Sequence, residues 1–226
     1  QVNKEIEEQN KKHVETVRNT QNVTSATGQL INVYTLLKGL ILGYAGKTLF
    51  ETLIGSNAQF EQYMATFEVL LGGAEQAQKR MDELTEFAAK TPFELPQVVE
   101  AEKRLLSYGV AAKDTAKMMQ VLGDLSMGNA EKLNSLTLAY GQVVTATRLT
   151  GGELRQFSEA GIPLLDELAK MYNTTTAEMR EMVSEGQISA EAVTVALQRL
   201  TSEGGKFYGM MDKQSQTMEG MWSTLK

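Results

Sequence analysis

A repeated helical pattern dominates the chain from Ser56 onward. Apolar side chains recur there at spacings of three and four residues, and each run of them stops at glycine or proline. Spacings of three and four place side chains on one face of a helix, whereas a half-buried strand alternates at every second residue. No alternation of period two over five or more residues is bounded by turn signals. We therefore expect an all-α, multi-helix fold whose short helices are punctuated by glycine and proline.

Helix ends are the next feature that the sequence marks. Glycine favours the left-handed backbone conformation with which many helices end. The expected ends are Gly72–Gly73, Thr91–Pro92, Gly109, Gly128, Gly151–Gly152, Gly161, Gly186 and Gly204–Gly205. Thr175 and Glu178 have capping-box spacing and predict a helix start. The last helix is expected to begin at Phe207 and to run towards Lys226.

Two prolines predict a rigid corner at TPFELP, residues 91–96. Thr91 and Glu94 have capping-box spacing, and Pro92 stands at the favoured first position of the helix that they would start. Pro96 follows too closely for that helix to continue, because an internal proline removes a hydrogen bond and collides with the preceding turn. The chain is therefore expected to change direction here.

A second corner is expected at Gly161, Ile162 and Pro163. Leu154 and Phe157 form the apolar face of the helix that leads to it. Glycine would end that helix, and proline would start the next one. Two successive short helices are therefore expected to meet at an angle.

The first part of the chain differs from the rest in composition. Residues 1–27 are polar and charged, with a thin apolar stripe at helical spacing that Asn10 and His13 interrupt. Such a stripe is typical either of a narrow coiled-coil seam or of an exposed helix held by its neighbours. We divide the chain into residues 1–27, a polar helix and candidate coiled coil, residues 28–57, an apolar helical segment, and residues 58–226, a helical module. Because no Met precedes the first residue and no signal ends the last helix, we expect a fragment of a longer protein.

Residues 30–54 are apolar on several faces. Lys38 and Lys47 interrupt them, whereas a membrane-spanning helix needs about 18 or more consecutive apolar residues. We expect a buried helix or one that faces another chain, with membrane insertion as the minor alternative. Gly39 and Gly43 stand four residues apart, a spacing that allows a second helix to approach closely. Glycines that are merely tolerated would leave the same pattern.

Composition removes several classes of chemistry. The chain has no cysteine, which excludes disulfides, thiolate zinc sites and cysteine nucleophiles. Its single histidine, His13, has no second histidine with which to share a metal and no evident nucleophile to activate. The letters GKT at residues 46–48 resemble the end of a phosphate-binding loop, but that motif requires a glycine where Ile41 stands. We expect no catalytic residue, no metal site and no cofactor, and we expect the protein not to be an enzyme.

Charge gives two further expectations. The acidic pairs Asp82–Glu83 and Asp166–Glu167 are expected on solvated helix faces, because neighbours on a helix point about 100° apart and cannot flank a substrate. The net charge is −6 and the basic residues are scattered, whereas nucleic-acid binding takes a basic stripe, so we expect no sequence-specific binding of nucleic acid. The helices on either side of GQIS, residues 186–189, are expected to form an ordinary hairpin rather than a DNA-binding helix-turn-helix.

A series of distinctive segments follows one another along most of the chain. They are LLGGAEQAQKRMDELTEFAAKTPFELPQV (70–98), LLSYG (105–109), VLGDLSMG (121–128), YGQV (140–143), LTGGELRQFSEAGIPLLDELA (149–169), SEGQIS (184–189), LTSEGGKFYGMM (200–211) and QSQTMEGMWSTLK (214–226). In order and spacing they resemble the tape measure domain of the tail tape measure proteins of tailed bacteriophages and prophages. The resemblance covers residues 58–226.

The resemblance implies structural positions and brings no catalytic residues. Together with the helix-end pattern, it gives this set of candidate corner and cap residues: Thr91, Pro92, Phe93, Pro96, Gly109, Gly161, Ile162, Pro163, Gly204, Gly205 and Phe207. One departure is Asn173, where the family pattern has a glycine after Met171. Asparagine tolerates the left-handed conformation, so the turn is expected to survive.

The resemblance also implies a mechanical function. Several copies of a long helical protein occupy the lumen of the growing tail, tail-tube subunits polymerise around them, and the length of the protein sets the length of the tube. On infection the protein leaves ahead of the DNA. The implied partners are further copies of the same chain and tail-tube, tail-tip and tail-chaperone proteins. The implied location is the tail-tube interior of the virion, and the host cytoplasm during assembly.

We expect residues 58–226 to be an assembly module rather than the ruler itself. One unbroken helix of the whole chain would be about 340 Å long, whereas a compact fold of this size has a radius of gyration of about 17 Å. Short helices with broad apolar faces favour the compact form. Two alternatives are a membrane-active module, in which residues 30–54 aid genome passage through the host envelope, and a segment associated with a cell-wall hydrolase.

Overall fold

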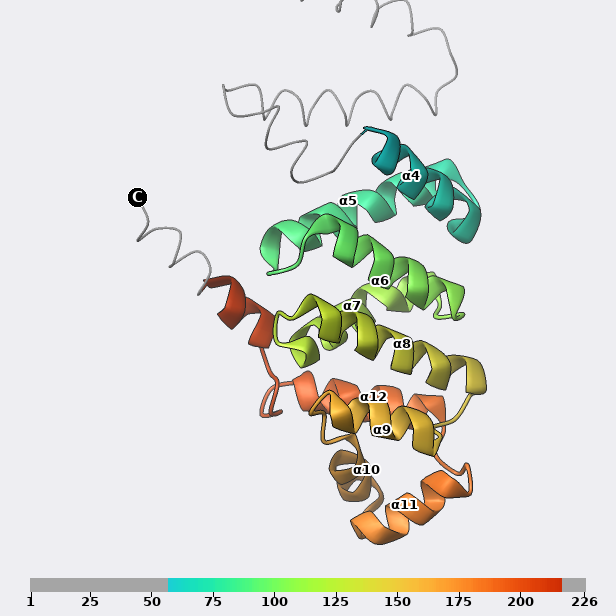
Figure 1. Ribbon diagram of the computed structural model, residues 1–226, viewed down its shortest axis with the longest axis vertical. Coiled ribbons are helices and arrows are strands. Elements are labelled where there is room, and N and C mark those ends of the chain that lie inside the picture. The colour runs from blue at the N-terminus through green and yellow to red at the C-terminus, as the bar shows by residue number, and fades with distance from the viewer. Residues whose placement is uncertain (1–56, 217–226) are drawn as a thin grey trace, which may run out of the picture. The chain divides into compact units, whose positions relative to one another are not determined.

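Figure 1 shows the computed structural model of the chain, which describes residues 57–216. The chain divides into two units after residue 60, so most of the described residues belong to the second unit. The predictions for residues 1–56, including the coiled-coil helix and the packing pair Gly39 and Gly43, lie outside the described residues.

Most of the described residues are helical. The helices are α4 (Asn57–Leu71), α5 (Ala74–Lys90), α6 (Leu95–Ser107), α7 (Ala112–Ser126), α8 (Ala130–Ala146), α9 (Gly151–Glu159), α10 (Leu164–Tyr172), α11 (Thr176–Ser184) and α12 (Ala190–Thr201). Residues 210–216 are helical as well. Between residues 57 and 216 there is no strand, although an isolated β-bridge joins Arg148 to Ser189. The predicted all-α fold is confirmed.

Within the second unit, helices pack both on their neighbours in sequence and on helices that follow later. α5 packs against α6, α6 packs against α7 and α8, and α8 packs against α9. α12 returns to pack against α7, α8 and α10, and α10 also contacts α9 and α11 (Figure 1). In this part of the chain, the helices bury one another's apolar faces.

The predicted hairpin of the helices around residues 186–189 does not form. α11 packs mainly against α10, whereas α12 packs against α10, α7 and α8. The connection explains the difference. The amide of Leu149 donates to Ile188 O at 2.8 Å, and the amide of Ala190 donates to Thr147 O at 3.1 Å. These two hydrogen bonds tie the start of α12 to the end of α8.

Apolar side chains at the predicted spacings form the core. On α12, all four residues of the expected face are buried: Val193, Ala196, Leu197 and Leu200. The largest fully enclosed side chains come from most of the described helices and the turns between them: Phe67, Met81, Leu105, Met119, Leu122, Leu125, Leu133, Leu136, Leu149, Phe157, Ile162 and Leu164. Burial of one large apolar side chain stabilises a fold by about 1.5–3 kcal/mol. The core therefore extends through the second unit.

Several helix ends lie where the sequence predicts them, because local hydrogen bonds fix them. α6 ends at Ser107, and Gly109 follows with a φ of 88°. The amide of Gly109 donates to Leu106 O at 3.0 Å, and the amide of Val110 donates to Leu105 O at 3.0 Å. The two bonds satisfy carbonyls at the helix end and require a left-handed residue between them.

The glycine pair Gly151–Gly152 is a correction. The sequence predicts that α8 ends near it, but α8 ends at Ala146 and the two glycines are the first residues of α9. Thr150 is the N-cap of α9, and its hydroxyl accepts a hydrogen bond from the amide of Gly152 at 3.2 Å. Glu153 completes the capping box. This box satisfies amides at the helix start, and it outweighs the tendency of glycine to end a helix.

The last described helix begins later than predicted. Phe207 lies in a turn, and its amide donates to Leu200 O at 2.9 Å. Its side chain is buried, so the backbone at this point follows the end of α12. Residues 210–216 then form the helix. The predicted apolar positions Met218 and Trp222 lie outside the described residues.

Candidate functional site

The first corner joins α5 to α6. Thr91 is the C-cap of α5, and Glu94 is the N-cap of α6. The amide of Glu94 donates to Gln97 Oε1 at 3.0 Å, so the capping box predicted for Thr91 forms three residues later. Pro96 explains the shift. In a helix started at Thr91, the ring of Pro96 would collide with the carbonyl of Pro92, whereas near the start of α6 it needs no amide partner.

This corner packs into the protein. Phe93 and Leu95 are buried. Pro92 lies beside Gly128, because a Cβ on Gly128 would stand 3.1 Å from Pro92 Cγ. The hydroxyl of Thr91 is buried without a hydrogen-bond partner. The corner is therefore held by apolar contact as well as by its capping bonds.

The second corner joins α9 to α10. Gly161 has a φ of 76°, and the amide of Ile162 donates to Phe157 O at 2.9 Å. Ile162 is buried, and Pro163 is the N-cap residue of α10. At the other end of α10, Asn173 has a φ of 52° and thus takes the left-handed conformation that its position requires. Both ends of this short helix are set by local backbone geometry.

The third predicted group, Gly204, Gly205 and Phe207, follows α12. Gly204 has a φ of 82°. A Cβ on Gly205 would overlap the carbonyl oxygens of Arg199 and Leu200, so this close approach requires glycine. Phe207 is buried beyond it. These residues turn the chain away from the end of α12.

The end of α5, α7 and residues 210–216 contact one another at one junction. Asp124 is buried, and its Oδ1 accepts a hydrogen bond from the amide of Met211 at 2.9 Å. The Met211 side chain is buried over Gly123, where any Cβ would overlap its sulfur. The hydroxyl of Ser215 donates to Lys90 O, at the last residue of α5, at 3.1 Å. We call these five residues the exit junction.

The carboxyl group of Asp124 is the electrostatic centre of the exit junction. Burial raises its pKa above the ordinary value of an aspartate. The hydrogen bond from the Met211 amide opposes this rise, and the charge of Asp212 adds to it. The partial positive charge at a helix start also favours the ionised carboxylate. Burial is the largest of these effects.

A second buried acid lies between α5, α6 and α7. Glu102 is fully buried; its Oε1 accepts a hydrogen bond from the Thr115 hydroxyl at 2.7 Å and lies 3.4 Å from Arg80 Nε. Its Oε2 has no hydrogen-bond partner. Burial raises the pKa of Glu102, and Thr115 and Arg80 oppose the rise. Arg80 also donates to Ala112 O at 2.5 Å and lies 3.2 Å from Glu83. The cluster links three helices in an enclosed place.

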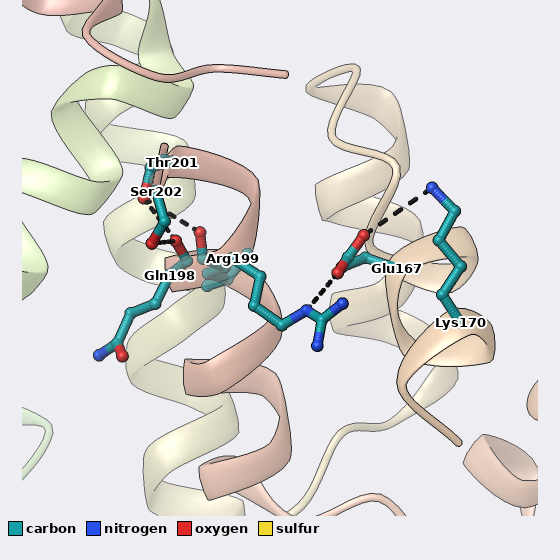
Figure 2. A network of polar contacts seen from close by, with 7 residues as sticks. Glu167, Lys170, Gln198, Arg199, Thr201 and Ser202 are labelled. Carbon is teal, nitrogen blue, oxygen red and sulfur yellow. Dashed lines mark hydrogen bonds and ion pairs between the residues drawn. The ribbon is translucent and has the colours of Figure 1, made fainter. Parts of the chain in front are cut away.

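Figure 2 shows a third polar network, between α10 and α12. Arg199 Nε donates to Glu167 Oε1 at 2.6 Å, and Lys170 Nζ lies 3.9 Å from Glu167 Oε2. The prediction that Asp166 and Glu167 both lie on a solvated face is wrong for Glu167, which is buried. The reason is that α12 packs against α10 and supplies an arginine. Asp166 is exposed as predicted.

A shallow depression of about 580 Å³ lies at the junction of α10 and α11, and it is widely open to solvent. Its lining residues are Asp166, Ala169, Lys170, Asn173, Thr174 and Thr176. Among the described residues, no three histidine or acidic side chains gather so as to hold a metal ion. Between residues 57 and 216, no helix combines the length and the apolar character needed to cross a membrane. The polar clusters described above join helices to one another.

Sequence reasoning did not single out the buried acids Glu102 and Asp124. Each stands at an apolar-face position of its helix: Glu102 follows Val98 by four residues, and Asp124 follows Val121 by three. A carboxylate at such a position indicates a buried, partnered acid. Its partner cannot be read from the pattern, since Met211 lies 87 residues from Asp124.

Comparison with known proteins gives one kind of match. A family model described as "Tape measure protein" matches residues 51–226, which include all the described residues. No curated protein and no solved structure matches the chain. The exit junction, the three corner and cap groups and the buried acids Glu102, Asp124 and Glu167 all lie within the matched region.

Proposed function

This chain belongs to the tape measure protein family, and on that basis we propose that residues 58–226 are an assembly module of a phage tail tape measure protein. Members of this family are structural proteins of the phage tail. In the proposed function, the tape measure protein occupies the lumen of the tail tube, sets the length of the tail and supports tail assembly and DNA delivery. In this function, the module supplies a folded surface on which other tail proteins dock.

The proposal of a docking module rests on one observation: the helices are short and pack against one another. The longest described helices, α5 and α8, have 17 residues each, or about 26 Å of length. A ruler converts residue number into distance only while it stays extended, at about 1.5 Å per residue of helix. The helices of residues 61–216 instead pack on one another. This arrangement favours docking over measurement of length.

The proposed partners are other copies of the chain and the tail-tube, tail-tip and tail-chaperone proteins. The role is structural rather than catalytic: Glu102 and Asp124 are buried and bonded to groups of the same fold. Sequence-specific binding of nucleic acid is not part of the function, because the net charge is −6 and the basic residues are dispersed. The proposed location is the interior of the tail tube, after assembly in the host cytoplasm.

Tail assembly in the producing phage tests the module against a ruler. Leu122→Asp places a charge in the fully buried core of α7 without changing the number of residues. We expect this variant to abolish tails or to leave them incomplete, as seen by electron microscopy. Lys113→Asp, at an exposed site on the same helix, is the matched control and should give normal tails.

A deletion of residues 58–226 also distinguishes an assembly module from a ruler. A pure ruler would yield normal numbers of tails, each shorter by about 250 Å if the deleted part were helical. An assembly module predicts that tails fail to form. Normal tail numbers with a shortening of that size would contradict the proposal.

The competing function is a membrane-active module. It rests on the apolar residues 30–54, which lie outside the described residues. Flotation of the purified chain with liposomes separates the two functions. We expect the chain to stay in the aqueous fraction, and flotation with the vesicles would favour the competitor.

A segment associated with cell-wall hydrolysis is the remaining alternative. The enclosed positions of Glu102 and Asp124 keep these acids away from any large substrate. We expect the purified chain to leave peptidoglycan intact. Release of soluble sugar or peptide fragments would overturn the structural role.

A further inference from the structure

The chain after α12 is firmly fixed as far as Phe207. The side chain of Phe207 is buried, and its amide donates to Leu200 O at 2.9 Å. Gly205 lies so close to the carbonyls of α12 that a Cβ would overlap them. Phe207 is thus anchored to the end of α12.

The next two residues are of a different kind. The side chain of Tyr208 is 53% exposed, and Gly209 has a φ of 63°, in the left-handed region. Glycine reaches this region without steric cost and can leave it equally freely. Rotation at Tyr208 and Gly209 would break the hydrogen bond from the Met210 amide to Phe207 O, at 3.3 Å, and redirect residues 210–216 while Phe207 stayed in place.

The helix of residues 210–216, which we call the exit helix, is held mainly at its first turn. Among its seven residues, Met211 is the buried one, at 4% exposure. It lies over Gly123 of α7, in a place that exists because that residue has no side chain. Among residues 210–216, one apolar side chain therefore provides the buried apolar contact.

The cap of the exit helix comes from another part of the fold. A helix start leaves amides unsatisfied, and a side chain just before it usually accepts one of them. Tyr208 and Gly209 carry no acceptor suited to this. Asp124 of α7 accepts from the Met211 amide instead, at 2.9 Å. The start of the exit helix thus depends on α7.

A hydrogen bond also joins the later part of residues 210–216 to α5. The hydroxyl of Ser215 donates to Lys90 O at 3.1 Å, at the exposed end of α5. Gln214 lies near Gly128, where a Cβ would stand 3.4 Å from its side chain. Gln214 and Ser215 are only partly buried, so both contacts lie near the surface.

We propose that the exit helix is a releasable strap. It leaves α7 as a unit, by rotation about Tyr208 and Gly209, while α5 to α12 stay folded and Phe207 stays in place. The released strap takes a different direction from the module without any loss of the core. This inference goes beyond the proposed function and stands on the geometry of the exit junction alone.

Hydrogen exchange of the full chain, followed by mass spectrometry, tests the strap. In the unchanged protein, we expect the amides of residues 210–216 to exchange at least about tenfold faster than the core amides of α12, because local opening requires less free energy than global unfolding. Equal exchange in the two helices would contradict the proposal, since it would show that the exit helix opens only when the fold does.

Two variants address the two sides of the contact. Asp124→Ala removes the cap, and Met211→Ala removes the buried side chain while leaving α7 unchanged. In each, we expect exchange of residues 210–216 to rise by about fivefold or more, the factor that corresponds to a lost cap of about 1 kcal/mol. Exchange in α12 should stay within about twofold. Asp114→Ala, at an exposed acid of α7, is the control and should leave the exit helix unchanged.

The outcomes separate cleanly. Faster exchange confined to residues 210–216 supports a strap that is seated on α7 and opens by itself. Faster exchange in the exit helix and α12 together would show that the exit helix is part of the cooperative core. Unchanged exchange in both variants would show that Asp124 and Met211 do not hold it. The last two results each overturn the proposal.

Discussion

Replacing the buried acid of α6 by an apolar side chain should stabilise the protein. Glu102→Met keeps a long unbranched side chain of comparable size, so it leaves no large cavity. Each partner of Glu102 retains another bond: the Thr115 hydroxyl donates to Ala112 O at 3.0 Å, and Arg80 donates to the same carbonyl at 2.5 Å. Arg80 also keeps its contact with Glu83. The substitution therefore leaves neither partner alone.

The magnitude follows from two opposing contributions. Losing a hydrogen bond to a charged group costs about 1.5–3 kcal/mol, and returning a buried ion to water recovers several kcal/mol. Burial raises the pKa of Glu102 in spite of Thr115 and Arg80, so burial is the larger contribution. Its Oε2 also has no hydrogen-bond partner. We expect the free energy of unfolding at pH 7 to rise by about 1–3 kcal/mol in Glu102→Met.

The pH dependence gives a second signature. Because the pKa of Glu102 is raised on folding, its contribution to stability is fully present below the unfolded-state value and is lost as pH rises through the folded-state value. Methionine has no such dependence. The advantage of Glu102→Met is therefore largest at neutral pH and fades as the pH falls to the ordinary glutamate value of 4.5.

Urea denaturation followed by far-ultraviolet circular dichroism, at pH 7 and at pH 4.5, measures both effects. An unchanged m value would show that the variant unfolds in the same way. Glu100→Met, at an exposed position of α6, is the matched control and should change stability by less than about 0.5 kcal/mol. A loss of more than about 1 kcal/mol in Glu102→Met at pH 7 would refute the reasoning, since the contacts of Glu102 would then outweigh its burial.

Two glycine substitutions and one NMR titration of a capping glutamate test other parts of the fold. Gly141→Ala places a methyl group against the ring of Tyr108, the C-cap of α6, so the free energy of unfolding should fall by about 1–3 kcal/mol in a urea titration. Gly152→Ala is the control: its methyl group would meet little but the hydroxyl of Thr150, so it should not lower the free energy of unfolding. Hydrogen bonds from the Thr174 hydroxyl and from the amide and hydroxyl of Thr175 lower the pKa of Glu178 to about 2. Its contribution to stability is thus present above the unfolded-state value and lost as pH falls through about 2; a midpoint near 4.5 in an NMR titration would contradict this capping geometry.

Local geometry accounts for what the sequence could predict. The turns at Gly109, Gly161 and Asn173 were predictable because their hydrogen bonds join residues a few positions apart. Prediction failed where two local signals compete. Thr91 and Glu94 both offer a helix start, and the choice depends on the ring of a later proline.

The exit junction shows why the candidate site was harder to predict. The resemblance identified corner residues such as Pro92 and Phe207, which lie two residues after Lys90 and four residues before Met211 in the sequence. It gave no reason to expect Asp124 or Gly123, because their roles depend on Met211 far along the chain. The roles of this buried carboxylate and this helical glycine become visible only when residues 210–216 are placed against α7. Contacts between residues far apart in the sequence therefore form the exit junction, whereas local hydrogen bonds and residue spacing determine most of the helices.

Mass spectrometry of purified phage tails is the most direct test of the central claim, that this chain is a structural part of the tail. The tryptic peptide Thr91–Lys103 spans the first corner and follows the cleavage site at Lys90. We predict that it sediments with tail-tube peptides through a density gradient, in a constant ratio to them. Its presence in the soluble lysate together with its absence from intact tails would contradict the account.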